Sequence, residues 1–342
     1  MAQLSIAARK PRRSSLGKTA VVVLACLLII APVVLAAGIR IMPLGDSITE
    51  GDGSSDMSGY RKRLYNRLLG LVDYDVDFVG SQSFGPATFD NDNEGHGGFM
   101  APQIAAQTFD WIAANPADIV LLHAGTNDVE KDPADIGTIL DEIDRFSTDT
   151  WVVLALIINR DWGDHYDTIV FNKALRSYAE NRIAQGDKIV IVDQEHALDY
   201  PDDLDDSVHP NDTGYLKMAE VWLQGLLEIL PAADAGPDQS ANSGAFVNLD
   251  GTGSSDRIGT IVSYSWSQTA GTPVVLANAG TATASFTAPD ISGGDALSFR
   301  LTIVDDKGLT HSDECDIAIN GSPVADAGGD QQVRDGLTVT LD

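Results

Sequence analysis

Between residues 38 and about 230, short apolar strands alternate with amphipathic helices, and this alternation limits the fold more than any other feature of the chain. The expected strands are apolar throughout and rich in β-branched residues; they cover 39–44, 76–79, 119–122, 152–158 and 189–192. Apolar residues at helical spacing predict helices over 60–68, 104–112, 136–146, 169–183 and 213–227, with Asn211 or Asp212 capping the last. This order predicts an α/β domain, in which helices cover both faces of a mostly parallel sheet.

At Pro231 the composition changes to Gly, Ser, Thr, Ala and Asp. Short alternating runs at 246–249, 261–266 and 297–304 predict an all-β sandwich over 231–322. The segment 233–239 recurs at 325–331, so residues 323–342 are expected to begin a second copy of the repeat. One strand cannot bury a sandwich face by itself. We therefore expect a fragment of a longer chain, with 323–342 poorly ordered.

The first 37 residues form a basic segment followed by an apolar run that ends in small residues. This order predicts a secretory signal peptide, with an uncleaved N-terminal anchor as the alternative. Either reading places the rest of the chain outside the cytoplasm, as a secreted or membrane-anchored protein. Only Cys315 remains beyond the apolar run, so no intramolecular disulfide is expected, and Cys315 is interpreted as a small buried apolar residue.

The chain is strongly acidic, with 50 Asp and Glu against 22 Lys and Arg and a net charge of −28. Such a surface repels phosphate and other anions. Nucleic acid, anionic lipid and acidic polysaccharide are therefore unfavourable partners.

Four polar blocks follow the predicted strands, where an open α/β sheet binds its ligands. They place Ser47 after the first strand, Gly80 after the second, Asn127 after the third, and Asp206 with His209 after the fifth. A serine needs a base to become a nucleophile, and a carboxylate three residues before the histidine can orient that base. The N–H groups of Ser47 and Gly80 and the amide of Asn127 are candidate oxyanion donors. A glycine at 80 is expected to let the backbone approach the substrate closely.

These blocks resemble, in order, the four motifs of the SGNH (GDSL-type) hydrolase superfamily. The wider wording resembles its acetylxylan-esterase-like branch, carbohydrate esterase family three; the matching segments are 41–51, 93–98 and 209–215. The resemblance implies a flavodoxin-like three-layer fold with no metal and no cofactor. It implies that Ser47 is the nucleophile, His209 the base and Asp206 its orienter, with Ser47, Gly80 and Asn127 as the oxyanion hole. Some relatives use a Ser–His dyad, so the role of Asp206 stays open. The segment from 233 onward resembles a PKD-type sandwich.

Several other polar residues have two readings. His96 either lines the site or makes a structural hydrogen bond, His123 is expected in the core, and His165 in a solvated loop. The run 90–95 is interpreted as an active-site loop rather than a calcium loop, since position 12 of the latter is Ala101. No zinc motif is present in the sequence. Four acidic residues in the sandwich loops are candidate calcium ligands: Asp250, Asp256, Asp305 and Asp306.

We expect an exported serine esterase that removes short acyl groups, acetyl above all, from a carbohydrate such as acetylated xylan. The PKD-type repeat would act as a spacer or as a contact to polymer or cell surface. The expected rim loops are polar and hold scattered aromatics suited to sugar rings: Phe84, Phe89, Trp162, Tyr166 and Tyr200. The alternatives are a lipolytic or thioesterase member of the superfamily and a non-catalytic surface adhesin.

Overall fold

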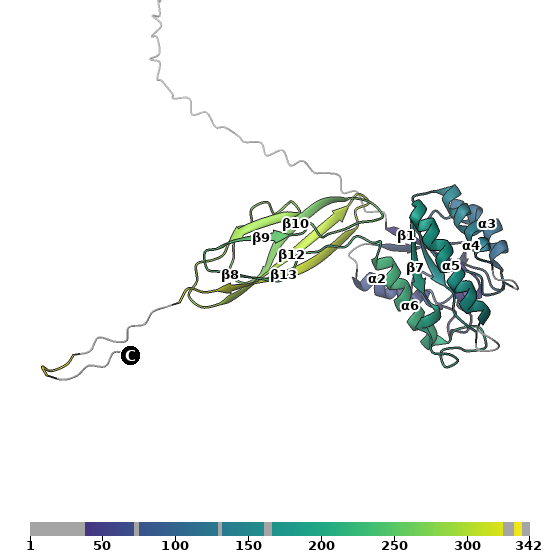
Figure 1. Cartoon of the computed structure of the whole chain (residues 1–342), viewed down its shortest axis with the longest axis horizontal. Coiled ribbons are helices and arrows are strands. Elements are labelled where there is room, and N and C mark those ends of the chain that lie inside the picture. The colour runs from purple at the N-terminus through teal and green to yellow at the C-terminus, as the bar shows by residue number, and fades with distance from the viewer. Residues whose placement is uncertain (1–37, 72–74, 129–131, 161–165, 324–331, 337–342) are drawn as a thin grey trace, which may run out of the picture. The chain divides into compact units, whose positions relative to one another are not determined.

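The computed structural model describes residues 38–71, 75–128, 132–160, 166–323 and 332–336 (Figure 1). The predicted signal peptide (1–37), Trp162, His165 and most of the second repeat lie outside the described residues. Among the residues that are described, no helix has the length and apolar character needed to cross a membrane.

The first folded part is a seven-stranded sheet, in the order β3-β4-β1-β5-β6-β7 with β2 also paired to β1. Its strands are β1 (Ile39–Gly45), β2 (Val76–Phe78), β3 (Gln82–Ser83), β4 (Asp92–Gly95), β5 (Ile119–His123), β6 (Trp151–Leu156) and β7 (Ile189–Asp193). All pairs are parallel except β3 with β4. The carboxyl ends of β1, β4 and β5 therefore meet at one edge of the sheet.

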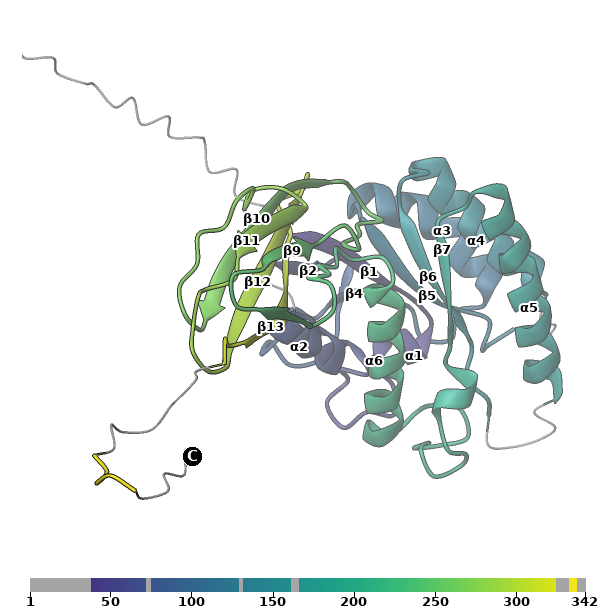
Figure 2. The ribbon, with the colours of Figure 1, turned by 60° about the vertical axis from the view of Figure 1, so that its left-hand side comes forward.

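Helices cover both faces of this sheet (Figure 2). Side chains of α2 (Arg61–Leu71) and α6 (Asp212–Leu227) share one buried cluster with the sheet. Those of α3 (Ala101–Ala114), α4 (Pro133–Phe146) and α5 (Tyr166–Gln185) share the other. Two short helices, α1 (Ser47–Glu50) and the 3₁₀ turn η1 (Glu195–Ala197), follow β1 and β7.

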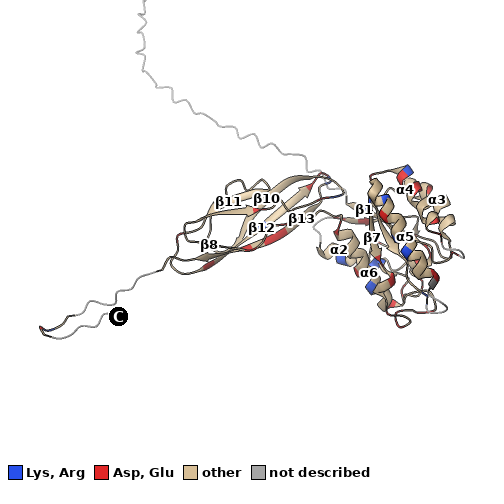
Figure 3. Ribbon diagram, viewed as in Figure 1, with Lys and Arg blue, Asp and Glu red and all other residues tan. Residues whose placement is uncertain are grey.

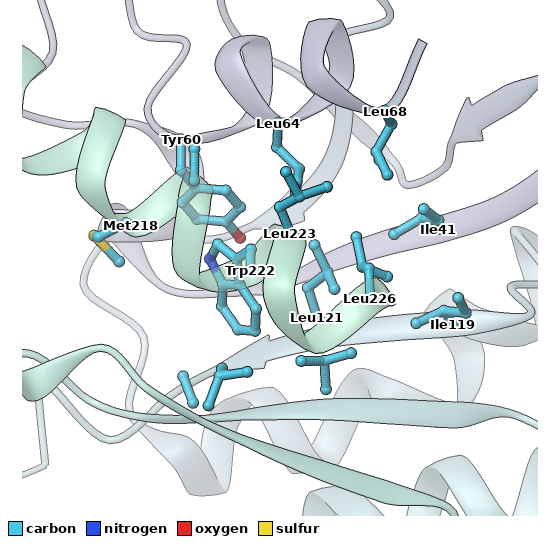
Figure 4. Close-up of a cluster of buried hydrophobic side chains, with 14 of the residues drawn as sticks. Ile41, Tyr60, Leu64, Leu68, Ile119, Leu121, Met218, Trp222, Leu223 and Leu226 are labelled. Atoms are coloured by element: carbon cyan, nitrogen blue, oxygen red, sulfur yellow. The ribbon is translucent and has the colours of Figure 1, made fainter. Parts of the chain in front are cut away.

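The α2–α6 side of the core is built around two large aromatics. Trp222 and Tyr60 are fully buried, and their ring centroids lie 5.6 Å apart. Figure 4 shows them among Leu64, Leu223 and Leu121, which come from both helices and from β5. Leucines at four-residue spacing on α2 supply the apolar stripe that this face needs.

The second folded part consists of two sheets around one core, and all their strand pairs are antiparallel except β13 with β8. Its strands are β8 (Gln239–Asn242), β9 (Phe246–Asp250), β10 (Ile261–Ala270), β11 (Thr283–Thr287), β12 (Asp295–Asp305) and β13 (Thr310–Asn320). One sheet has the order β10-β12-β13-β8, and the other pairs β11 with β9. Trp266, Phe286 and Phe299 fill the core. Cys315 is buried among them, and burial raises the pKa of its thiol to about 11, as expected for an apolar, unreactive residue.

The predicted fold class is confirmed, and the five expected strands and five expected helices of the first part are all present within a few residues. The interpretation of 90–95 as a loop is wrong for 92–95, which form strand β4 between β3 and β1. Its acidic sequence is typical of an exposed loop, yet most of the strand is buried. This is possible because hydrogen bonds satisfy the fully buried carboxylate of Glu94. It accepts from the Ser81 N–H at 2.7 Å and from the Ser81 hydroxyl at 2.6 Å.

Candidate active site

Ser47 lies in the turn that joins β1 to α1, at the carboxyl edge of the sheet. Asp46 is the N-cap of α1, and its Oδ1 accepts from the Ile48 N–H at 3.1 Å. The Asp46 carboxyl is fully buried, and this burial raises its pKa to about 6. The cap fixes the turn, and with it the direction of the Ser47 side chain.

His209 and Asp206 come from the loop between β7 and α6 and complete a hydrogen-bonded chain with Ser47. The Ser47 Oγ lies 2.8 Å from His209 Nε2, and His209 Nδ1 lies 2.8 Å from Asp206 Oδ2. The other Asp206 oxygen accepts from the N–H groups of Val208 and His209, each at 2.7 Å. Desolvation acts to raise the pKa of Asp206, but the hydrogen bonds from His209 and Val208 outweigh it and lower that pKa. Asp206 therefore stays ionised and holds the imidazole in place.

The expected oxyanion donors lie at the ends of neighbouring strands. Ser47 is the first residue of α1, so its N–H has no acceptor within the helix. Gly80 follows β2, and its N–H donates to no acceptor among the described residues. Asn127 follows β5, and its Nδ2 donates to the Phe99 carbonyl at 3.0 Å, which fixes the amide and leaves its second hydrogen available.

The reason expected for glycine at 80 needs correction. A Cβ at Gly80 would lie 2.0 Å from the carbonyl oxygen of Asn93, which belongs to β4. The backbone at Asn93 therefore leaves no room for a side chain at position 80, whatever binds at the Gly80 N–H. The role of this N–H as an oxyanion donor stays a prediction.

Two acidic side chains lie beside Ser47 and His209, in a chain with acidic residues on both folded parts (Figure 3). Asp52 Oδ2 lies 4.0 Å from His209 Nε2. Glu50 Oε2 accepts from the Gly97 N–H at 2.7 Å, and a Cβ at Gly97 would lie 3.9 Å from the Ser47 Cβ. Desolvation and the nearby Asp52 charge raise the pKa of Glu50. Carboxylates and backbone groups, rather than an apolar surface, thus adjoin this side of Ser47.

Arg61 is a supporting residue that the sequence did not single out. It is fully buried, and its guanidinium makes five hydrogen bonds at 2.8–3.0 Å to main-chain carbonyls. The acceptors belong to α1, to the α1–α2 loop and to the β3–β4 connection: Thr49, Glu50, Met57, Phe84 and Asn91. Burial lowers its pKa to about 10, so it remains charged at neutral pH. An arginine at the start of an amphipathic helix carries no sequence signal for this role.

His96 makes structural contacts beside the site. Its Nε2 lies 2.6 Å from the buried Glu94 Oε1, and its ring stacks on Trp111 with centroids 4.2 Å apart. The structural reading of His96 is thus supported by its contacts. His123 is fully buried, as expected for a core histidine, and its Nε2 accepts from the Ile158 N–H at 3.4 Å.

Two of the five aromatics expected at the rim do not offer a free ring face. Phe89 is buried against Tyr65, with centroids 6.2 Å apart. The Tyr200 hydroxyl donates to the Glu195 carbonyl at 2.9 Å and accepts from the Asn159 N–H at 3.0 Å. Both residues anchor their loops, Phe89 through its buried ring and Tyr200 through the two hydrogen bonds of its hydroxyl. Trp162 and the Tyr166 side chain lie outside the described residues, and Phe84 is half-buried.

Comparison with known proteins gives two domain matches. Residues 44–217 match the model of the GDSL-like Lipase/Acylhydrolase family. Residues 235–319 match the model of a PKD domain family.

Similar proteins include esterases. The chain is 31% identical over 239 residues to a multidomain esterase of Ruminococcus flavefaciens, an alignment that covers 60% of this chain and 30% of that protein. The chain thus spans less than a third of that relative's length. A family 3 carbohydrate esterase of Clostridium thermocellum is 30% identical with a TM-score of 0.51, covering 56% of this chain and 96% of that one. A family 3 carbohydrate esterase from Talaromyces cellulolyticus is 29% identical with a TM-score of 0.49, covering 56% and 97%.

Proposed function

Since the chain belongs to the GDSL-like lipase/acylhydrolase family, we propose that it is a serine esterase that removes acetyl and other short acyl groups from a neutral carbohydrate. The observation that carries this proposal is the hydrogen-bonded chain from Ser47 through His209 to Asp206, with both distances at 2.8 Å. The similarity to the Clostridium thermocellum family 3 carbohydrate esterase supports the carbohydrate.

In the acylation step the Ser47 Oγ attacks the ester carbonyl carbon while its proton passes to His209 Nε2. The carbonyl oxygen becomes an oxyanion, which the N–H groups of Ser47 and Gly80 and the Asn127 amide stabilise. The tetrahedral species then collapses. The sugar oxygen leaves with the proton from His209, and the acyl group remains on Ser47.

In the deacylation step water takes the place of the sugar. His209 Nε2 accepts a proton from the water as its oxygen attacks the acyl carbon, and returns it to the Ser47 oxygen as the carboxylic acid leaves. Asp206 remains ionised throughout, and its charge favours the imidazolium that forms in each half of the cycle.

The acidic groups near Ser47 favour short acyl chains and neutral substrates. The Glu50 carboxylate next to Gly97 and the Asp52 carboxylate near His209 offer no apolar surface to a fatty chain. Each buried methylene is worth about 0.8 kcal/mol, and a long chain gains this only where apolar side chains meet it. The same carboxylates repel uronic acids and phospholipid headgroups.

The site is open enough for a polymer. The side chains of His209 and Asp206 are 22% and 53% exposed, so a sugar carried on a long chain reaches Ser47 without a deep channel. We also propose that the protein is exported, on the strength of the basic and apolar segment at 1–37, and that the PKD-type domain contacts polymer or cell surface.

The test is a chain-length profile. We expect kcat/KM to fall steeply from p-nitrophenyl acetate through butyrate to octanoate, and acetate to be released from acetylated xylan. Ser47→Ala should remove both activities, because it deletes the attacking oxygen and little else. Acetylated pectin serves as the acidic control polymer and should be a poor substrate.

Two outcomes contradict the proposal in different ways. A flat or rising profile with chain length would favour the lipolytic alternative and leave the catalytic residues in place. Absence of turnover on every ester, in a protein folded by circular dichroism, would favour a non-catalytic binding protein.

A further inference from the structure

The loops of the sandwich bring three carboxylates together at one end of β12. Asp305 is the last residue of β12, Asp306 follows it in the turn to β13, and Asp256 lies in the connection between β9 and β10. Each offers one carboxylate oxygen, and these three oxygens lie within 4.8 Å of one another. Like charges this close repel one another strongly unless a cation lies between them.

Asp305 is the unusual member of this group. It is only 2% exposed, and its Oδ1 accepts from the N–H groups of Lys307 at 3.0 Å and Leu309 at 2.6 Å. Its Oδ2 is buried without a hydrogen-bond partner among the described residues. A buried carboxylate oxygen without a partner costs free energy, so such atoms call for an explanation.

Asp256 repeats the pattern. Its Oδ1 accepts from the N–H groups of Ile258 and Gly259, at 3.0 and 3.1 Å, while its Oδ2 is buried without a partner among the described residues. Backbone donors thus hold one oxygen of Asp256 and one of Asp305, and each has a second, unpartnered oxygen. This is the arrangement of carboxylates oriented toward a ligand.

Gly259 keeps space next to the cluster. A Cβ at this position would lie 2.2 Å from Asp306 Oδ1 and 3.0 Å from Asp256 Oδ2. Any other residue would therefore displace two of the three acidic side chains.

Asp250 in the sandwich and the second acidic cluster of the described residues differ from this group. Asp250 is the last residue of β9; it is exposed and accepts from the N–H and hydroxyl of Thr252, and it is not part of the cluster. In the α/β domain, Asp193, Glu195 and His196 are also close together. There, however, both Glu195 oxygens accept from the side-chain amides of Asn159 and Asn172.

We propose that Asp256, Asp305 and Asp306 form a calcium site in the PKD-type domain. Hard oxygen ligands on two different connections of the sandwich suit the variable geometry of Ca²⁺ better than the strict octahedron of Mg²⁺. Three carboxylates leave the remaining positions to water, so the affinity belongs to the range of extracellular modules, with a dissociation constant on the order of 10⁻⁴–10⁻³ M. The cation would join the β9–β10 connection to the β12–β13 turn and stabilise this end of the sandwich.

The test is thermal unfolding of the full chain, treated with chelator and then titrated with CaCl₂ to several millimolar. We expect the unfolding temperature of the sandwich to rise by about 4–15 °C, since this binding is worth about 1–2 kcal/mol in a domain of this size. In Asp305→Asn the amide oxygen still accepts from the two backbone N–H groups, so the variant should fold. It should equal or exceed the calcium-free parent in unfolding temperature, because a buried charge is gone, and should gain nothing from calcium.

Asp250→Asn is the matched control, and its response to calcium should equal that of the parent. MgCl₂ at the same ionic strength should give at most a small shift. The proposal is overturned if calcium leaves the parent unchanged, or if Asp305→Asn responds as the parent does, since the shift would then come from diffuse binding to an acidic surface.

Discussion

Replacing the buried Arg61 by methionine should destabilise the α/β domain more than the same replacement of an exposed arginine on α2. The methionine fills much of the same volume but removes five donors from carbonyls in α1 and in two loops. The Thr49 carbonyl lies in a fully buried hydrogen bond, whereas the other four acceptors are part-buried and regain some water.

The magnitude follows from these five contacts. An unsatisfied buried carbonyl costs about 1–3 kcal/mol, and each of the four rehydrated ones loses about 0.5–1 kcal/mol, which gives about 3–7 kcal/mol in total. That is a large share of the ~5–15 kcal/mol by which a typical domain is stable.

The assay is urea unfolding followed by circular dichroism at the helix band, which reports the α/β domain because all described α-helices belong to it. Arg61→Met should lower the urea midpoint by more than about 1 M. The urea midpoint of Arg61→Lys should also be lower than that of the parent, since one ammonium group cannot reach five acceptors.

Arg63→Met is the matched control, two residues away on the same helix. Its side chain is 47% exposed and pairs with Glu220 at 3.0 Å. An exposed pair of this kind is worth about 0–1 kcal/mol, so the midpoint should barely move. Equal midpoints for the Arg61 and Arg63 variants would refute the view that Arg61 holds the loops around Ser47.

Three further changes test the site. Asn127→Ala should lower kcat by about 10²–10³ with little change in KM, the usual effect of one lost oxyanion donor; a change confined to KM would make Asn127 a binding residue. Asp206→Asn should lower kcat and leave residual activity, while unchanged kcat would mean that Ser47 and His209 work as a dyad. Asp46→Asn should remove a pH dependence of stability: burial raises the Asp46 pKa from 3.8 to about 6, so its contribution is full below pH 3.8 and is lost as pH rises through 6. The free energy of unfolding of the variant relative to the parent, measured in urea, should therefore increase by up to about 3 kcal/mol from pH 4 to pH 7.5. A difference between variant and parent that is the same at both pH values would contradict this.

The positions of the main strands and helices, and the polar residues at the strand ends, could be predicted from the sequence because they depend on local patterns. Apolar β-branched runs mark buried strands, and residues directly after them must meet at one edge of a parallel sheet, which brings Ser47 beside His209. The sequence predicts Asn211 or Asp212 as the cap of the last helix; the structure has Asn211 there, and its side chain accepts from the N–H groups of Thr213 and Gly214.

What the sequence did not reveal depends on partners far along the chain. The sequence of β4 is typical of a polar loop, and the contacts to Ser81 and His96 that let Glu94 be buried are not visible in it. The role of Arg61 needs carbonyls as distant as Asn91, and the requirement for Gly80 needs the backbone of Asn93. Such contacts have no periodic signature, since each joins one residue to the main chain of another loop or strand.

In the proposed mechanism Ser47 is the nucleophile and His209 activates it. The most direct measurement is reaction of the full chain with diethyl p-nitrophenyl phosphate, followed by peptide mass spectrometry. We predict one diethylphosphoryl group, carried by Ser47, with activity on p-nitrophenyl acetate lost in proportion to labelling. His209→Asn should react far more slowly, because the serine then lacks its base. Labelling at another residue, or full activity in protein labelled at Ser47, would contradict the account.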